Sequence, residues 1–73
     1  MNNIDRDGAV SIADQYLRNE GLGDYKTGAA QFIGGGWQVP VHDSTFKGFL
    51  TVDKRTGRVT PDNRIKTLRK YRP

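Results

Sequence analysis

One amphipathic helical pattern, over residues 7–20, constrains the fold of this chain more than any other feature. At about 100° per residue, its apolar side chains fall within an arc of roughly 160°, and polar side chains lie on the opposite side. The arc is formed by Ala9, Val10, Ile12, Ala13, Tyr16 and Leu17. One helix cannot bury such a stripe by itself, so we expect it to pack on a sheet.

Aspartates and glycines mark the expected ends of this helix. Asp5 or Asp7 can cap its start, because a carboxylate accepts the free backbone N–H groups and favours the positive end of the helix dipole. Gly21 and Gly23 follow the last apolar position. Glycine readily adopts the left-handed conformation that commonly ends a helix, so the helix should stop there.

After the helix the period of the pattern changes to two, which is typical of strands. Residues 24–33 form a plausible first strand, and residues 37–42 and 46–53 alternate clearly. The sequence DKRTGR then predicts a hairpin turn, with Gly57 at the position that requires a positive φ. Residues 58–60 return as a short strand.

The two alternating segments divide their side chains between a core face and an opposite face. We expect the core face to hold Trp37, Val39, Val41, Phe46, Gly48, Leu50 and Val52, and the opposite face to hold Gln38, Pro40, His42, Lys47, Phe49, Thr51 and Asp53. Pro40 cannot donate a backbone hydrogen bond. Its strand should therefore lie at a sheet edge or contain a bulge.

Small size limits how such a domain is stabilised. A chain of 73 residues buries only about 60% of the surface that its unfolded form exposes. It contains no cysteine, which excludes disulfide bonds and thiolate metal sites. We therefore expect Phe32, Trp37, Phe46 and Phe49 to supply most of the core area per residue.

The N-terminal sequence MNNIDRDG lacks the apolar region of a signal peptide. No apolar run approaches the length of about 18 residues that suggests a transmembrane helix. The default expectation is a soluble cytoplasmic protein without membrane contact, although an export signal trimmed before residue 1 would leave no trace here.

The C-terminal segment, residues 61–73, follows a domain formed by residues 1–60. Thr60 can act as the N-cap and Pro61 as the first residue of a short basic helix, and a frayed tail is the alternative. The expected fold class is α+β: one N-terminal helix packed on a three- to four-stranded antiparallel meander, with a short basic helix or tail at the C-terminus.

The segments GAVSIADQYL, GGWQVPVHD and GFLTVDKRTGRVT resemble a PepSY-type domain over residues 7–60. The VDKRTGRV hairpin is also similar to hairpins of small bacterial immunity-protein domains. The matching residues are Trp37, Val39 and Val41 in the core and Asp53 and Gly57 in the turn. The resemblance implies a non-enzymatic domain with an inhibitory or regulatory protein-binding role, and it brings no catalytic residues. Such domains usually lie outside the cytoplasm, often beside a peptidase or a membrane segment.

Three motifs that could carry chemistry favour a structural role. Residues 34–36, all glycine, precede a strand pattern rather than the helix that a phosphate-binding loop needs, so we interpret them as a hairpin turn. Trp37 is interpreted as a core anchor rather than a stacking platform. His42, Asp43 and Ser44 supply triad residue types, but neighbouring side chains on a strand point to opposite faces. We predict no enzymatic activity, catalytic residue, metal or cofactor.

Lys47, Phe49 and Thr51 are the first candidate binding residues, because they lie opposite the expected core face. The sequence KGF fits the start of an RNA-binding strand signature, but the second aromatic ring of that signature is missing. An exposed ring between basic groups suits a protein contact or stacking on single-stranded nucleic acid. The interpretation we prefer from the sequence is that Phe49 packs under the C-terminal segment, against Ile65 or Leu68.

Charge is distributed unevenly along the chain. Residues 1–43 contain three Lys or Arg and six Asp or Glu, whereas residues 44–73 contain nine and two. The remaining candidate binding residues are the basic side chains Arg64, Lys66, Arg69, Lys70 and Arg72. Such a segment can bind phosphates or an acidic protein, and a plain solvated tail is the third reading.

Together these patterns predict a small non-enzymatic binding module that inhibits or regulates a protein partner. The alternative is a nucleic-acid-binding module that uses the same basic half. A protein partner would meet the Lys47–Phe49–Thr51 face, the basic C-terminus or an open strand edge, which can accept an added strand. The sequence identifies neither the partner nor the oligomeric state.

Overall fold

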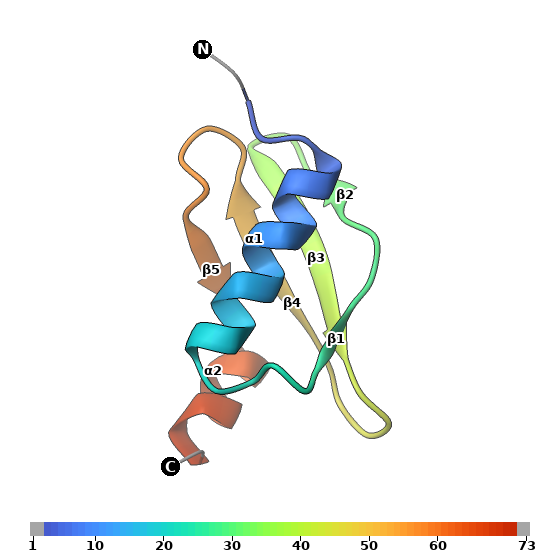
Figure 1. Cartoon of the computed structure of the whole chain (residues 1–73), viewed down its shortest axis with the longest axis vertical. Helices are drawn as coiled ribbons and strands as arrows, with labels where there is room; N and C mark the ends of the chain where they lie inside the picture. Colours follow the sequence, from blue (N-terminus) through green and yellow to red (C-terminus); the bar gives the residue numbers. More distant parts are fainter. Residues whose placement is uncertain (1–2, 72–73) are drawn as a thin grey trace.

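A computed structural model describes the backbone of residues 3–71 and the side chains of residues 3–68. The elements run in the order α1 (Arg6–Asn19), β1 (Lys26–Thr27), β2 (Gln31–Phe32), β3 (Gly36–His42), β4 (Lys47–Asp53), β5 (Val59–Pro61) and α2 (Asn63–Tyr71). The strands pair antiparallel. α1 crosses one face of the sheet, and α2 lies near the end of β5 (Figure 1). The predicted α+β class is confirmed. In the described part of the chain, neither helix has the length and apolar character needed to cross a membrane.

Hydrogen bonds at both ends of α1 satisfy its free backbone groups, with a side chain at the start and the backbone at the end. Asp5 is the N-cap, and its Oδ1 accepts a hydrogen bond from the N–H of Gly8 at 2.7 Å. At the other end, the N–H of Leu22 donates to the carbonyl of Leu17 at 2.7 Å, and Gly21 between them has a φ of 75°. This is the Schellman arrangement. Of the two predicted caps, Asp5 is the one used.

The core lies between α1 and the sheet. From the predicted stripe, Ala9, Ala13 and Leu17 are at most 1% exposed. The other buried apolar side chains come from the sheet, from α2 and from connecting segments: Leu22, Ala30, Val39, Val41, Leu50, Val52 and Ile65. Ile65 belongs to α2, so this helix completes the same core as α1 and the sheet.

β3 is a central strand, so of the two alternatives predicted from Pro40, an edge position or a bulge, the edge position is wrong. It pairs with β4 on one side and with both β1 and β2 on the other. Gly28 donates its N–H to the carbonyl of Pro40 at 2.9 Å, and pairing resumes at Gln31. The two residues between Gly28 and Gln31 therefore both lie opposite Val39, which makes a β-bulge in the neighbouring strand. The pairing is interrupted beside the proline, so a central strand can contain it.

The same bulge divides the first predicted strand, residues 24–33, into the two-residue strands β1 and β2. At the bulge, a Cβ on Gly28 would lie 2.8 Å from Cγ of Pro40. β2 lies at the sheet margin, where Phe32 is 52% exposed and contacts Trp37 edge-on at 5.2 Å between ring centroids. The expectation that Phe32 supplies core area is therefore wrong.

Residues 34 and 35 form the hairpin turn between β2 and β3, which confirms the predicted hairpin, and Gly36 is the first residue of β3. The N–H of Ile33 donates to the carbonyl of Gly36 at 2.9 Å, and Gly34 has a φ of 90°. Trp37 follows on the core side but is only half-buried. Its Nε1 donates to the carbonyl of Ile4 at 2.8 Å. Trp37 therefore ties the N-terminal segment to the sheet.

α2 begins at a different cap from the one predicted. Thr60 and Pro61 belong to β5, where they pair with β4. Asp62 is the residue that caps α2, because its Oδ1 accepts a hydrogen bond from the N–H of Ile65 at 2.9 Å. Of the two alternatives for this segment, the helix is the one observed. The turn before β5 closes at Gly57, whose φ of 76° matches the prediction.

Candidate binding surface

β4 presents alternate side chains to the two sides of the sheet, as its sequence predicts. Gly48, Leu50 and Val52 are buried on the side that α1 covers. Residues that share a row across paired strands point to the same side of a sheet. The opposite side, which we call the outer face, is formed by Gln38, Pro40, His42, Lys47, Phe49, Thr51, Asp53 and Thr60.

Phe49 is the most exposed apolar side chain of the outer face, with 43% of its surface accessible. The interpretation that it packs against Ile65 or Leu68 is wrong. Ile65 lies on the other side of the sheet, where a Cβ on Gly48 would be 3.1 Å from its Cγ1. Leu68 lies beside Phe46. In the described part of the chain, no aromatic ring or cation contacts the ring of Phe49.

The backbone that carries Phe49 is held on both sides. Its N–H donates to Oδ2 of Asp62 at 2.9 Å, and its carbonyl accepts the N–H of Asp62 at 3.1 Å. The other carboxylate oxygen of Asp62 caps α2. On the opposite side, Phe49 lies across from Pro40 of the central strand. A fixed backbone lets an exposed ring bind a partner with little further ordering of the chain.

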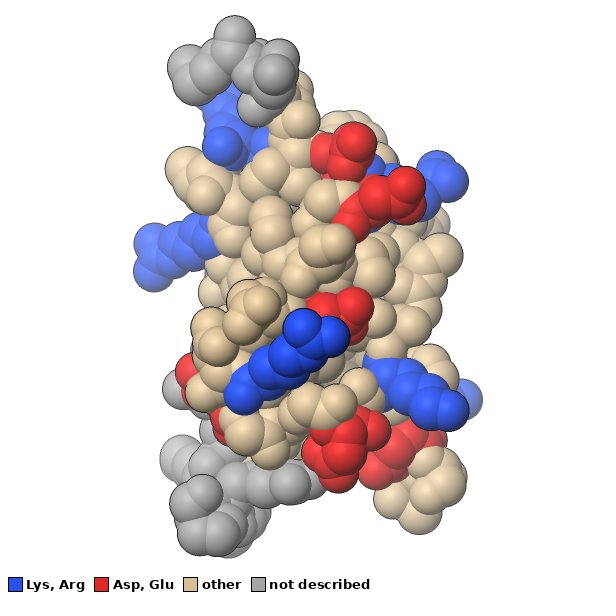
Figure 2. Space-filling view, in the orientation of Figure 1, with Lys and Arg blue, Asp and Glu red and all other residues tan. Residues whose placement is uncertain are grey.

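Polar and basic side chains surround this ring. Lys47 lies across from His42, and Thr51 lies between Gln38 and Thr60. The side of the molecule that carries α1 looks different, because Lys and Arg are interspersed there with Asp and Glu (Figure 2). The basic side chain next to Phe49 on β4 is Lys47, whereas the carboxylate of the outer face, Asp53, lies at the far end of β4 and accepts hydrogen bonds from the turn that follows. The part of the outer face around Phe49 therefore suits an anionic or neutral partner better than a cationic one.

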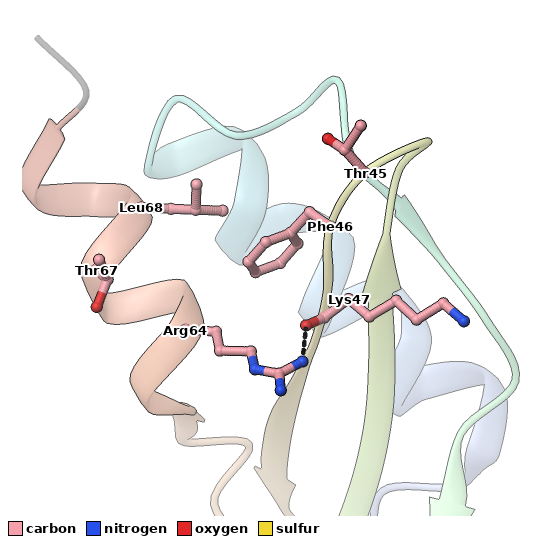
Figure 3. A pocket seen from close by; sticks show the side chains of 6 residues that line it. All are labelled: Thr45, Phe46, Lys47, Arg64, Thr67 and Leu68. Carbon is pink, nitrogen blue, oxygen red and sulfur yellow. Dashed lines mark hydrogen bonds between the residues drawn. The ribbon is translucent and has the colours of Figure 1, made fainter.

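Arg64 of α2 is brought next to the outer face. Its Nη1 donates to the backbone carbonyl of Lys47 at 3.1 Å. Between α2 and the turn that joins β3 to β4 lies a hollow of about 440 Å³, lined by Thr45, Phe46, Lys47, Arg64, Thr67 and Leu68. Figure 3 shows Leu68 and Phe46 pointing toward one another, Arg64 reaching the carbonyl of Lys47, and the Lys47 side chain pointing away from α2.

The other basic candidates do not join this arrangement. Lys66 is exposed, and helical geometry puts it on the side of α2 opposite the hollow. Arg69 and Lys70 belong to α2, but their side chains lie outside the described residues, as does all of Arg72. The structure thus brings together Lys47, Phe49, Thr51 and Arg64 and leaves Lys66 apart.

Two carboxylates near the ends of β4 hold turns. Asp43 Oδ1 accepts the N–H groups of Thr45 and Phe46, both at 2.8 Å. Asp53 Oδ1 accepts the N–H of Thr56 at 3.0 Å and that of Arg55 at 2.8 Å, and these two bonds hold the pKa of Asp53 below its ordinary value. Asp43 therefore bonds the turn, not its neighbour His42. No group of three or more potential metal ligands occurs among the described residues.

Sequence reasoning missed the hollow between α2 and the β3–β4 turn. The available signal was that Arg64 and Leu68 are four residues apart on a basic helix, so they share a side of it.

Searches of protein-family models, curated proteins and solved structures find no match to this chain. The resemblance to PepSY-type and immunity-protein domains therefore stays a prediction.

Proposed function

We propose that this chain is a non-enzymatic binding module whose outer face contacts a protein partner, with inhibition or regulation of that partner as the outcome. The observation that carries the proposal is the exposure of Phe49, at 43%, in a row of the sheet that neither helix covers. A small domain normally uses its aromatic rings for its core. Aromatic side chains that remain accessible are enriched at protein interfaces.

The surroundings of Phe49 fit the usual anatomy of an interface. Hot spots tend to be aromatic side chains at the centre of a patch, inside a rim of polar groups that excludes water. Here Thr51 and Lys47 flank the ring on β4, Pro40 lies across from it, and Arg64 lies beyond Lys47. Because Lys47 and Arg64 supply positive charge, we expect the partner to present an acidic region beside an apolar side chain.

The outer face is a better candidate than the sheet edges. On one margin, β1 and β2 have two residues each and are separated by the bulge. On the other, β5 has three residues and ends with Pro61, which has no N–H to donate. Very short edge strands and prolines are the features by which proteins resist strand addition. A partner strand would therefore find few backbone groups to pair with at either margin.

Affinity capture with matched double variants tests the proposal. Lys47→Ala/Phe49→Ala removes a lysine and an exposed aromatic ring from the proposed surface. Phe32→Ala/Lys66→Ala removes the same two residue types elsewhere, because Phe32 is 52% exposed at the sheet margin. We expect a partner that the wild type and the control capture to be lost by the first variant. If every specific partner survives the first variant, the outer face is not the binding surface.

Single-stranded nucleic acid is the second candidate ligand, and the same exposed ring favours it. A ring beside lysine can stack on a base while the cation meets a phosphate. Binding to generic oligonucleotides should then fall steeply with added salt. It should also fall in Phe49→Ala and in Arg64→Gln, whereas deletion of α2 is unsuitable because Ile65 is buried in the core. Lack of binding even at low salt rejects this candidate.

A further inference from the structure

We infer that the hollow between α2 and the β3–β4 turn binds the free C-terminus of a peptide whose last side chain is apolar. This inference rests on the proposed function, since it assumes that the partner is a protein, and it assigns that partner a second point of contact. Phe46 and Leu68 supply the apolar walls, and Arg64 supplies the charge beside them.

The size and openness of the hollow fit one terminal residue. Its volume of about 440 Å³ falls within the range of roughly 300–1,000 Å³ that is typical of ligand sites. Four of its lining residues, Thr45, Lys47, Arg64 and Thr67, are exposed, so the hollow is open to solvent on one side. An open hollow can accept a side chain while the rest of a peptide runs out over the surface. A long lipid chain would need a more enclosed cavity.

Arg64 is positioned to bind a carboxylate. One of its guanidinium nitrogens donates to the carbonyl of Lys47 at 3.1 Å, which fixes the head of the side chain at the rim of the hollow. The guanidinium has five N–H donors, so most of them remain available for a planar, two-oxygen acceptor. Among the described residues, Arg64 has no carboxylate partner. An anchored arginine without a counter-ion favours an anionic ligand.

Asp43, the carboxylate of the β3–β4 turn, does not act as the counter-ion of Arg64. Asp43 directs Oδ1 to the backbone N–H groups of Thr45 and Phe46, and Oδ1 also lies 3.4 Å from the Thr45 hydroxyl. Thr67 turns its hydroxyl back to the carbonyl of Asn63 at 2.9 Å. These bonds keep the rim in place and leave Arg64 as the cationic side chain above an apolar floor. A terminal carboxylate next to an apolar side chain combines both complementary chemistries.

NMR titration of the isotopically labelled full chain tests this inference with a defined probe. The probe is acetyl-Gly-Ser-Leu with a free terminal carboxylate, and its control is the same peptide with a terminal amide. We expect the free acid to shift the amide signals of residues 45–47 and 64–68, and the amide control to bind about tenfold or more weakly, because a charge-assisted hydrogen bond is lost.

Two variants of α2 with the same change of charge locate the carboxylate. Arg64→Gln should weaken binding of the free acid by about tenfold or more. Lys66→Gln should leave binding unchanged, because residue 66 lies on the other side of the helix. Equal binding of acid and amide, equal effects of the two variants, or no shifts with millimolar peptide would overturn the inference.

Sodium octanoate separates a peptide site from a lipid site. Octanoate binding with the same Arg64 dependence, but without binding of the peptide, would overturn the assignment to a peptide terminus. The outcome of the peptide titration does not depend on the proposed outer-face contact, because that contact is tested through Phe49. If the peptide fails while partner capture still requires Phe49, the inference is wrong and the proposed function stands. If the peptide binds while capture ignores Phe49, the outer-face proposal is the one that fails.

Discussion

The two sides of β4 differ sharply in burial. Leu50 and Val52 are completely buried on the side that α1 covers. Phe49, the residue before Leu50, points to the other side and has 43% of its surface accessible. Adjacent residues of one strand thus differ in burial. Burial on the covered side stabilises the domain, whereas Phe49 of the outer face stays accessible, so the two sides can be altered separately.

The strongest way to break this comparison is to truncate neighbouring residues on the two sides. Leu50→Ala should lower the free energy of unfolding by about 2–5 kcal/mol, because it leaves a cavity in the core. Phe49→Ala should lower it by about 1 kcal/mol or less, the range of strand propensity for a surface position. Urea unfolding followed by circular dichroism measures both values. Equal losses would mean that Phe49 is a core residue after all.

The next largest effect concerns the glycine turn, where the outer side of the sheet leaves no room for a side chain. A Cβ on Gly36 would collide with the backbone carbonyl of Val52, whereas a Cβ on Gly35 would meet nothing within 4 Å. Gly36→Ala should therefore cost about 1–3 kcal/mol of stability through overpacking. Gly35→Ala should be close to neutral. Thermal unfolding of the pair tests this, and similar melting temperatures would contradict the close approach of β3 and β4.

A smaller effect is expected at the rim of the covered side. Trp37→Phe keeps an aromatic ring but removes the hydrogen bond from Nε1 to the carbonyl of Ile4. The loss should be about 1 kcal/mol, typical of one hydrogen bond. Amide exchange should also become faster at Ile4, whose N–H donates to the carbonyl of Lys54 at 2.7 Å. Unchanged exchange at Ile4 would show that Trp37 does not anchor the N-terminal segment.

The smallest effect is the pH dependence carried by the turn after β4. The N–H groups of Thr56 and Arg55 stabilise the ionised carboxylate and hold the pKa of Asp53 below the ordinary value of 3.8. This contribution to stability is present above that value and is lost as the pH falls through the lowered pKa. Asp53→Asn should flatten the dependence of unfolding free energy on pH in this range. An unchanged slope would assign the acid sensitivity to other groups.

Patterns with a short period predicted most of the fold. The stripe of α1 and the alternation of β3 and β4 depend on local geometry, and both agree with the structure. Errors arose where a distant segment decides the outcome. Pro40 predicted either an edge or a bulge; the edge is wrong, and the bulge lies in the neighbouring strand, which no local pattern indicates. The cap moved to Asp62 because β5 uses Thr60 and Pro61 for pairing with β4.

The part of the candidate site that depends on local geometry was also predictable. Period-two alternation is enough to put Lys47, Phe49 and Thr51 on one side of the sheet. Coverage of Phe49 by α2 depends on which face of the sheet Ile65 packs against. That packing is a tertiary contact. The hollow beside Arg64 also depends on the approach of α2 to the β3–β4 turn. Neither could be read from residues near one another in the sequence.

Amide chemical-shift mapping of the labelled protein with a captured partner, or with an oligonucleotide if that is what binds, tests the central claim most directly. The outer-face account predicts that the largest changes fall on Lys47, Phe49 and Thr51 and on their cross-strand neighbours of β3. It also predicts little change along α1, which lies on the other side of the sheet. Changes concentrated in α1, with the signals of β4 unmoved, would contradict the account.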